Sequence, residues 1–297
     1  MKILFITKGT GIDYLNDTVF HGLVSLYGDD VIDSNYQWYL SKCDELRLSN
    51  LYGKGFTIGN NLEHRINLDR SNLEDKIAQH YFDIIIYGSI WRCDDYYDLV
   101  AQHYSFNNII ILDGEDHPYI NTKYKKGLYF KRELFFYYNI CSSFNSYPLN
   151  VFPISFSIPE SKFMNINSNK IYFDSPMSPK NINSYIYENE IEYYKQYNES
   201  YFGYTTKKGG WDCMRHYEII AAGCLPFFDN YEYCPKYILT NWPSSLQYDV
   251  NQFYFNVECN GDELNIYLYY KLLQDFYDYA KNNFKTTDIA NYIISKI

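Results

Sequence analysis

The stretch 2–33, "KILFITKGTGIDYLNDTVFHGLVSLYGDDVID", decides the fold class of this chain. The apolar run 2–7 predicts a short buried strand, and the glycines in 8–13 predict a turn. Apolar residues recur at helical spacing in 14–28, and a second short strand follows at 30–33. Strand, glycine-containing turn, helix and strand in this order are typical of the start of a Rossmann-like unit.

The alternation of helices and strands continues further along the chain. We expect helices at 72–81 and 93–105, each followed by an apolar strand, at 82–89 and in the segment 108–118. Strands that are apolar along their whole length, alternating with helices, indicate a parallel sheet covered on both faces. The sequence therefore predicts an α/β fold. The segment 35–70 yields no clear pattern.

A connector with three prolines, at 147–163, separates two such halves. We predict an N-terminal half, 1–155, and a C-terminal half, 156–297. The expected elements of the second half are strands at 170–175, 199–205 and 225–228, and helices at 183–197, 212–222, 262–284 and 286–297. The fold prediction is thus two Rossmann-like halves.

Composition narrows the function classes. The chain has 297 residues and a formal net charge of −10, which disfavours general binding to nucleic acid or anionic membranes. Its seven cysteines include no CxxC pair, which favours a reducing compartment. No apolar run reaches the ~18 residues of a membrane span, and the start is too quickly interrupted for a signal peptide. We expect a cytoplasmic protein without a membrane span.

The segment 205–228, "TTKKGGWDCMRHYEIIAAGCLPFF", combines a glycine-opened turn with the start of a helix. Asp212 is the expected cap of that helix, and Gly223 its end. Glycines let a ligand approach the backbone, and a helix start favours anions. The residues expected to hold a diphosphate here are Lys207, Lys208, Gly209, Gly210 and Arg215, with Asp212 in the same site at the helix start. The alternative is an ordinary helix and strand with an Arg215–Glu218 surface pair.

This segment resembles the donor-binding helix of GT-B glycosyltransferases, especially the CgeB-like and exostosin-like branch. Their R-x-x-E-x-x-A-x-G-x-x-P pattern is matched by Arg215, Glu218, Ala221, Gly223 and Pro226. The resemblance implies two Rossmann-like domains facing across a cleft, with the last helix crossing back to the N-terminal domain. It also implies that Glu218 binds the ribose of a nucleotide sugar and that Arg215 faces its phosphates.

The sequence departs from the pattern at one position. Many retaining members carry a glutamate eight positions before the ribose-binding glutamate, and here that position is Gly210. Asp212 is the nearest acid. The departure leaves retention or inversion of the sugar open.

Candidate bases follow two predicted strands. In an open α/β sheet, ligands lie beyond the carboxyl ends of the strands, where "LDGEDHPYI" (112–120) supplies Asp116 and His117. Asp13 follows the first strand. An inverting transfer needs a base for the acceptor hydroxyl, so Asp13, Asp116 and His117 are the catalytic candidates. The alternative is that these acids cap the next segment or pair with nearby lysines.

We therefore expect a metal-independent glycosyltransferase. Its donor would be a UDP- or GDP-linked sugar, no other cofactor is expected, and the acceptor would be a hydroxyl of a glycan or similar molecule. A metal site built on Asp113 and Glu115 would match the D-x-D motif of GT-A enzymes only loosely. Two further alternatives are a non-catalytic nucleotide- or sugar-binding module and a DNA-base glycosyltransferase, the latter using the basic, aromatic segment 123–134.

Overall fold

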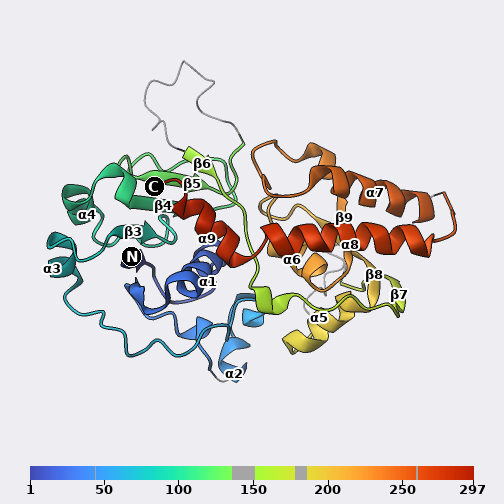
Figure 1. The fold of residues 1–297 in the computed structure, drawn as a ribbon, viewed down its shortest axis with the longest axis horizontal. Coiled ribbons are helices and arrows are strands. Elements are labelled where there is room, and N and C mark those ends of the chain that lie inside the picture. Colours follow the sequence, from blue (N-terminus) through green and yellow to red (C-terminus); the bar gives the residue numbers. More distant parts are fainter. Residues whose placement is uncertain (44, 136–150, 178–185, 259) are drawn as a thin grey trace, which may run out of the picture.

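The computed structural model describes residues 1–43, 45–135, 151–177, 186–258 and 260–297. Two parallel sheets organise them (Figure 1), so the predicted α/β class is confirmed. The first sheet has the order β2-β1-β3-β4-β5-β6 and the second the order β7-β8-β9. The strands are β1 Ile3–Ile6, β2 Val31–Asp33, β3 Ile84–Tyr87, β4 Ile109–Asp113, β5 Leu128–Lys131, β6 Val151–Pro153, β7 Tyr172–Asp174, β8 Ser200–Thr206 and β9 Leu225–Asp229.

Helices cover both faces of the six-stranded sheet. The central strands β1, β3 and β4 are buried along their whole length, because apolar side chains point to both faces. One face packs against α1 (Tyr14–Tyr27) and α9 (Thr286–Ile294). The other face packs against α3 (Leu73–Ala78) and α4 (Tyr97–His103). The short helix α2 (Glu45–Leu48) lies in the segment 35–70.

Strands β5 and β6 were not expected from the sequence. Strand β5 lies in the basic segment 123–134, and β6 lies in the proline-containing connector. The side chain of Lys131 is fully buried at the end of β5, where its Nζ lies 2.7 Å from Oδ1 of Asp113. Because that partner comes from the neighbouring strand, the charge gives no local sign that this segment is buried.

The second sheet carries α5 (Glu190–Asn198), α6 (Met214–Ala221), α7 (Ser244–Glu258) and α8 (Ile266–Asn283) around it. Helix α7 was not expected. The expected helix 183–197 is confirmed from Glu190 onward, whereas 183–185 lie outside the described residues. The expected helix 212–222 begins two residues later, at Met214.

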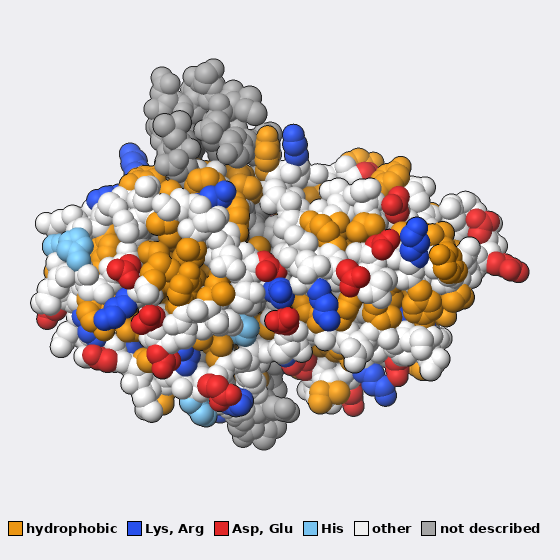
Figure 2. Space-filling model, viewed as in Figure 1, with side chains coloured by type: hydrophobic (Ala, Val, Ile, Leu, Met, Phe, Trp, Pro, Cys, Tyr) orange, Lys and Arg blue, Asp and Glu red, His pale blue; other side chains and the backbone are white. Residues whose placement is uncertain are grey.

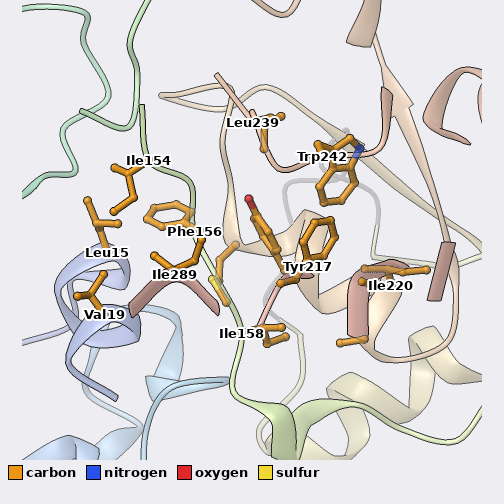
Figure 3. Packing of buried hydrophobic residues seen from close by; sticks show 14 of the residues in the cluster. Leu15, Val19, Ile154, Phe156, Ile158, Tyr217, Ile220, Leu239, Trp242 and Ile289 are labelled. Atoms are coloured by element: carbon orange, nitrogen blue, oxygen red, sulfur yellow. The ribbon is translucent and has the colours of Figure 1, made fainter. Parts of the chain in front are cut away.

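An apolar segment, 154–158, joins the packing around the two sheets (Figure 3). Its side chains Ile154, Phe156 and Ile158 lie between α1 and α9 on one side and Tyr217 and Trp242 on the other. The backbone of Ile158 also bonds to the chain just before α9, with its N–H donating to the carbonyl of Phe284 at 2.8 Å. One continuous apolar cluster therefore runs between the sheets.

Helix α9 packs closely on α1, on the N-terminal sheet. A Cβ at Gly22 of α1 would lie 2.1 Å from the carbonyl oxygen of Thr286, so only glycine permits this approach. Beside it, Nδ1 of His21 lies 2.9 Å from Oγ1 of Thr286. Among the described residues, no helix combines the length and the apolar character needed to cross a bilayer.

Candidate functional site

A cavity of about 360 Å³ lies beyond the carboxyl ends of β1, β3, β4, β5 and β8. Its lining comes from segments of both sheets. The order of the first sheet reverses between β1 and β3, the point at which doubly wound sheets bind ligands. The size falls within the range of small-molecule sites, about 300–1,000 Å³. Lining residues include Asp13, Arg92, Glu115, Asp116, Arg132, Lys208, Gly209, Gly210, Asp212, Arg215 and Glu218.

Asp212 does not cap α6, contrary to the sequence-based expectation. The N-cap residue is Cys213, and no side chain caps the helix start there. The carboxylate of Asp212 instead accepts hydrogen bonds from the backbone N–H of Phe156, at 2.7 Å, and from the hydroxyl of Tyr217, at 3.0 Å. Complete burial raises the pKa of Asp212 to about 7. Asp212 therefore ties the end of the glycine-containing turn to Phe156 and Tyr217.

Glu218 lies on α6 at the floor of the cavity and is only 5% exposed. Two protein hydroxyls donate to its carboxylate, Oγ1 of Thr57 to Oε1 and the hydroxyl of Tyr193 to Oε2, the latter at 2.6 Å. Burial raises the pKa of Glu218, and these two hydrogen bonds oppose the shift. Each carboxylate oxygen thus holds one protein hydroxyl and retains a second lone pair.

Thr57 reaches Glu218 because the segment 52–57 leaves the N-terminal sheet and docks on the region of α5. Nζ of Lys54 donates to the carbonyl of Tyr187 at 2.7 Å, and N–H of Thr57 donates to Oε1 of Glu190 at 2.5 Å. Thr57 has φ 73°, a conformation that costs a β-branched residue energy and is typical of functional sites. No clear pattern was found in the sequence over 35–70, so this contact was missed.

The basic residues around the turn divide between the cavity and the surface. Lys208 and Arg215 line the cavity. Desolvation lowers the pKa of Lys208, and the nearby Arg215 lowers it further. Lys207 does not line the cavity, and its ammonium lies 5.4 Å from the centre of the Trp211 ring. The lining therefore includes two of the three cations proposed for the diphosphate.

Arg132 directly follows β5 and lines the cavity. From the sequence alone, it was included only as part of the basic segment 123–134. Its side chain is 1% exposed and donates to the carbonyl of Gly114 at 3.0 Å, to the carbonyl of Asp212, and to Asp116. Glu133 beside it accepts from the backbone N–H of Asp212 at 3.0 Å. Residues 132 and 133 thereby fix the turn that precedes α6.

Both glycines of that turn are required by close approach. A Cβ at Gly209 would lie 2.1 Å from Oδ2 of Asp116. A Cβ at Gly210 would lie 2.5 Å from Oε1 of Glu133. At Gly210, where many retaining glycosyltransferases carry an acid in the sequence, the space is filled by a carboxylate from the segment after β5.

The catalytic candidates occupy different environments. Asp13 caps α1, accepting from N–H of Asn16 at 3.3 Å, and its Oδ2 lies 3.2 Å from the guanidinium of Arg92. Asp116 pairs with Arg132 at the cavity wall. His117 does not line the cavity. Its ring lies 5.2 Å from Trp91 and 5.5 Å from Tyr119, measured between ring centres.

A second acid, Asp17, lies behind Asp13 and was not identified from the sequence. It is fully buried and accepts from N–H of Asp13 and from the hydroxyl of Tyr39, both at 2.9 Å. Burial raises the pKa of Asp17 to about 8, and the neighbouring charge of Asp13 acts in the same direction. Asp17 fixes the backbone at the start of α1.

Asp113, which the D-x-D reading would use for a metal, is turned away from the cavity. Its carboxylate is fully buried and bonds to Nζ of Lys131 at 2.7 Å, the hydroxyl of Tyr129 at 2.5 Å and Nε1 of Trp91 at 2.9 Å. No group of three or more His, Cys, Asp or Glu side chains is placed to hold a metal ion in the described parts of the chain.

The basic segment 123–134 does not present one continuous charged strip. Lys131 and Arg132 are buried, and Nζ of Lys123 lies 2.6 Å from Oδ2 of Asp94. Figure 2 shows acidic and basic side chains interspersed over the face in view. The arrangement offers little to the phosphates of a nucleic acid.

The cavity thus brings together most of the residues proposed from the sequence: Asp13, Asp116, Lys208, Gly209, Gly210, Asp212, Arg215 and Glu218. His117 and Lys207 do not line it. A scan against protein-family models and a search of curated proteins both find no match for the chain. The geometry of the cavity and the motif on α6 therefore carry the functional inference.

Proposed function

We propose that this protein is a glycosyltransferase of the GT-B type, which moves a sugar from a nucleoside-diphosphate sugar to an acceptor hydroxyl. One observation carries the proposal: the motif residues Glu218 and Arg215 share a cavity with Asp13 and Arg92, which follow strands of the other sheet. In the GT-B arrangement, two Rossmann-like domains face each other across a cleft, one for the donor and one for the acceptor. We propose that residues of about 156–297 bind the donor and residues of about 1–155 the acceptor.

Glu218 binds the ribose of the donor. Its two oxygens already accept one protein hydroxyl each, from Thr57 and Tyr193. The remaining lone pairs suit the two neighbouring hydroxyls of a ribose, because a buried, oriented carboxylate accepts such donors without reorganising.

The diphosphate lies against the turn 208–210 and the start of α6. Arg215, Lys208 and Arg132 supply positive charge to the cavity, and the helix start adds its free amides. These groups stabilise the charge that develops on the leaving diphosphate as its bond to the sugar breaks. The proposed chemistry has no step that needs a metal ion.

Asp13 acts as the base. It takes the proton of the acceptor hydroxyl while the acceptor oxygen bonds to the anomeric carbon and the nucleoside diphosphate leaves. Asp13 lies at the switch point of the sheet, whereas Asp116 is bonded to Arg132 beside the diphosphate turn. Asp116 therefore orients Arg132.

A ligand panel tests the proposal. We expect UDP or GDP, and their sugars, to raise the melting temperature, whereas CMP should not. Glu218→Gln should weaken nucleotide binding about 10- to 100-fold, corresponding to a hydrogen bond to a charged group of about 1.5–3 kcal/mol. Glu192→Gln, on the exposed face of α5, is the matched control.

The outcomes separate the alternatives. If the wild-type protein releases nucleoside diphosphate from a UDP- or GDP-sugar and Glu218→Gln does not, sugar transfer is supported. Nucleotide binding without turnover on any donor identifies a non-catalytic binding module instead. Absence of binding to every nucleotide, or equal binding by Glu218→Gln and wild type, refutes the donor site.

A further inference from the structure

Exposed aromatic side chains lie beside the cavity. Trp91 is 43% exposed and Tyr119 is 71% exposed, and the ring of His117 contacts both. Trp91 follows β3 and the other two follow β4, so all three belong to the sheet edge at which the cavity opens. We call Trp91, His117 and Tyr119 the aromatic platform.

The platform is anchored from beneath. Nε1 of Trp91 donates to Oδ2 of Asp113 at 2.9 Å, although Asp113 is itself fully buried. The other carboxylate oxygen of Asp113 lies 2.7 Å from Nζ of Lys131, which is also fully buried. A buried ion pair that holds the edge of an exposed indole fixes the orientation of the ring, as binding sites require.

Polar groups connect the platform with the cavity. Arg92 follows Trp91 directly, and Glu115 and Asp116 precede His117; all three line the cavity. Glu115 lies 3.5 Å from the guanidinium of Arg92, and Asp116 pairs with Arg132. The remaining lone pairs of both carboxylates can accept hydrogen bonds from hydroxyl groups. The surroundings of the platform therefore offer donors and acceptors to a ligand that is rich in hydroxyls.

We propose that the aromatic platform binds the sugar rings of a carbohydrate acceptor. The planes of the Trp91 and His117 rings meet at 87° and those of His117 and Tyr119 at 44°, so each sugar ring stacks on one exposed ring, that of Trp91 or of Tyr119. A sugar ring presents C–H groups on its faces and hydroxyls on its rim, so an aromatic ring covers the former while carboxylates accept the latter. Nucleic acid also stacks on aromatic rings, but its phosphates are disfavoured by the net charge of −10 of the chain. The inference rests on the proposed sugar transfer, for which it names the acceptor class.

Titration with maltohexaose, cellohexaose and chitohexaose, followed by saturation-transfer NMR and calorimetry, tests the platform. We expect wild type to bind at least one of them and Tyr119→Ala to weaken that binding about tenfold, because an aromatic anchor is lost. Trp91→Ala should weaken it at least as much. Tyr267→Ala, at an 82% exposed tyrosine in the first turn of α8, should leave it unchanged.

Binding of UDP and GDP is measured in the same variants and should not change. No binding of the three hexasaccharides to wild type overturns the platform, and so does wild-type affinity in both Tyr119→Ala and Trp91→Ala. Binding of a single-stranded DNA oligomer that is lost in Tyr119→Ala overturns it in favour of nucleic acid. A platform that binds carbohydrate without any nucleotide binding refutes the donor site alone.

Discussion

The two walls of the cavity hold their carboxylates in opposite ways. Glu218, on the side of α6, is buried and bonded to two hydroxyls. Asp13 and Asp116, on the side of the six-stranded sheet, pair with arginines instead, and their side chains are 13% and 60% exposed. Under the proposed function, the carboxylate bonded to hydroxyls recognises the ribose, and Asp13 takes the proton of the acceptor. The proposal thus gives binding to one wall and proton transfer to the other.

Arg132 joins the two walls, so its removal should have the largest effect. Arg132→Met leaves the carbonyls of Gly114 and Asp212 and the carboxylate of Glu133 without this donor. Breaking a buried charge network costs about 3–5 kcal/mol. We expect that loss in urea unfolding. Arg92→Met, at a half-exposed arginine, should cost less than about 1 kcal/mol. Equal small losses in both would show that the walls are independent.

The division of roles predicts a contrast among the candidate bases. Asp13→Asn should lower turnover about 10²- to 10⁴-fold and leave nucleotide binding unchanged, because asparagine still caps α1 but cannot take the proton. His117→Ala should leave hydrolysis of the nucleotide sugar, in which water replaces the acceptor, nearly unchanged. Lost turnover together with retained nucleotide binding in Asp13→Asn would support the assignment. A larger loss in Asp116→Asn would transfer the role to Asp116.

Substitutions at Gly209 and Gly210 test how closely the two walls of the cavity pack against each other. Gly210→Ala drives a methyl group into the buried carboxylate of Glu133, and overpacking of this kind costs about 1–3 kcal/mol. Gly209→Ala meets the carboxylate of Asp116, which is exposed and can move aside, so its cost should be smaller. Gly11→Ala, with no atom within 4 Å of the added carbon, is the control. Unfolding in urea ranks the three, and a reversed order of Gly210 and Gly209 would contradict the geometry.

Each wall is backed by a buried acid, and these acids predict a pH dependence of stability. The pKa is about 8 for Asp17 and about 7 for Asp212, above the ordinary 3.8 of an aspartate. The folded chain therefore binds more protons than the unfolded chain above pH 4. Each acid makes its full contribution to the free energy of unfolding below pH 4. This contribution falls as pH rises, until about pH 7 for Asp212 and about pH 8 for Asp17.

The limiting slope is about 1.4 kcal/mol per pH unit for each group. Asp212→Asn can keep both partners, since its oxygen accepts from Phe156 and its amide donates to Tyr217. Urea unfolding between pH 4.5 and 7 should therefore show a shallower decline in Asp212→Asn than in wild type. Parallel curves would mean that Asp212 does not hold its proton in the folded state.

The sequence predicted the parts of the fold whose signal is local. The apolar run at 82–89 and the strand expected within 108–118 became β3 and β4, and the run 225–228 became β9. Strand β5 was missed because its final lysine is neutralised by Asp113, a residue 18 positions away in the chain. Charge pairing between strands leaves no periodic trace in one segment.

In the candidate site, too, residues with a local signal were predicted and residues that depend on long-range contacts were missed. Glu218, Arg215 and the glycine turn were found because they lie close together in a recognisable pattern. Thr57 was not, since its contact with Glu218 spans 161 positions and depends on a backbone conformation that threonine rarely adopts. His117 was named beside Asp116 because both follow β4, but only Asp116 lines the cavity.

The packing of α9 on α1 has a consequence for biosynthesis. During translation, the six-stranded sheet leaves the ribosome long before residues 286–294, which cover one of its faces. Until then Leu15 and Val19 lack part of their packing, and the nascent N-terminal region exposes apolar surface. A fragment that ends before α9 should therefore aggregate or recruit chaperones, and adding the 286–297 peptide in trans should rescue it.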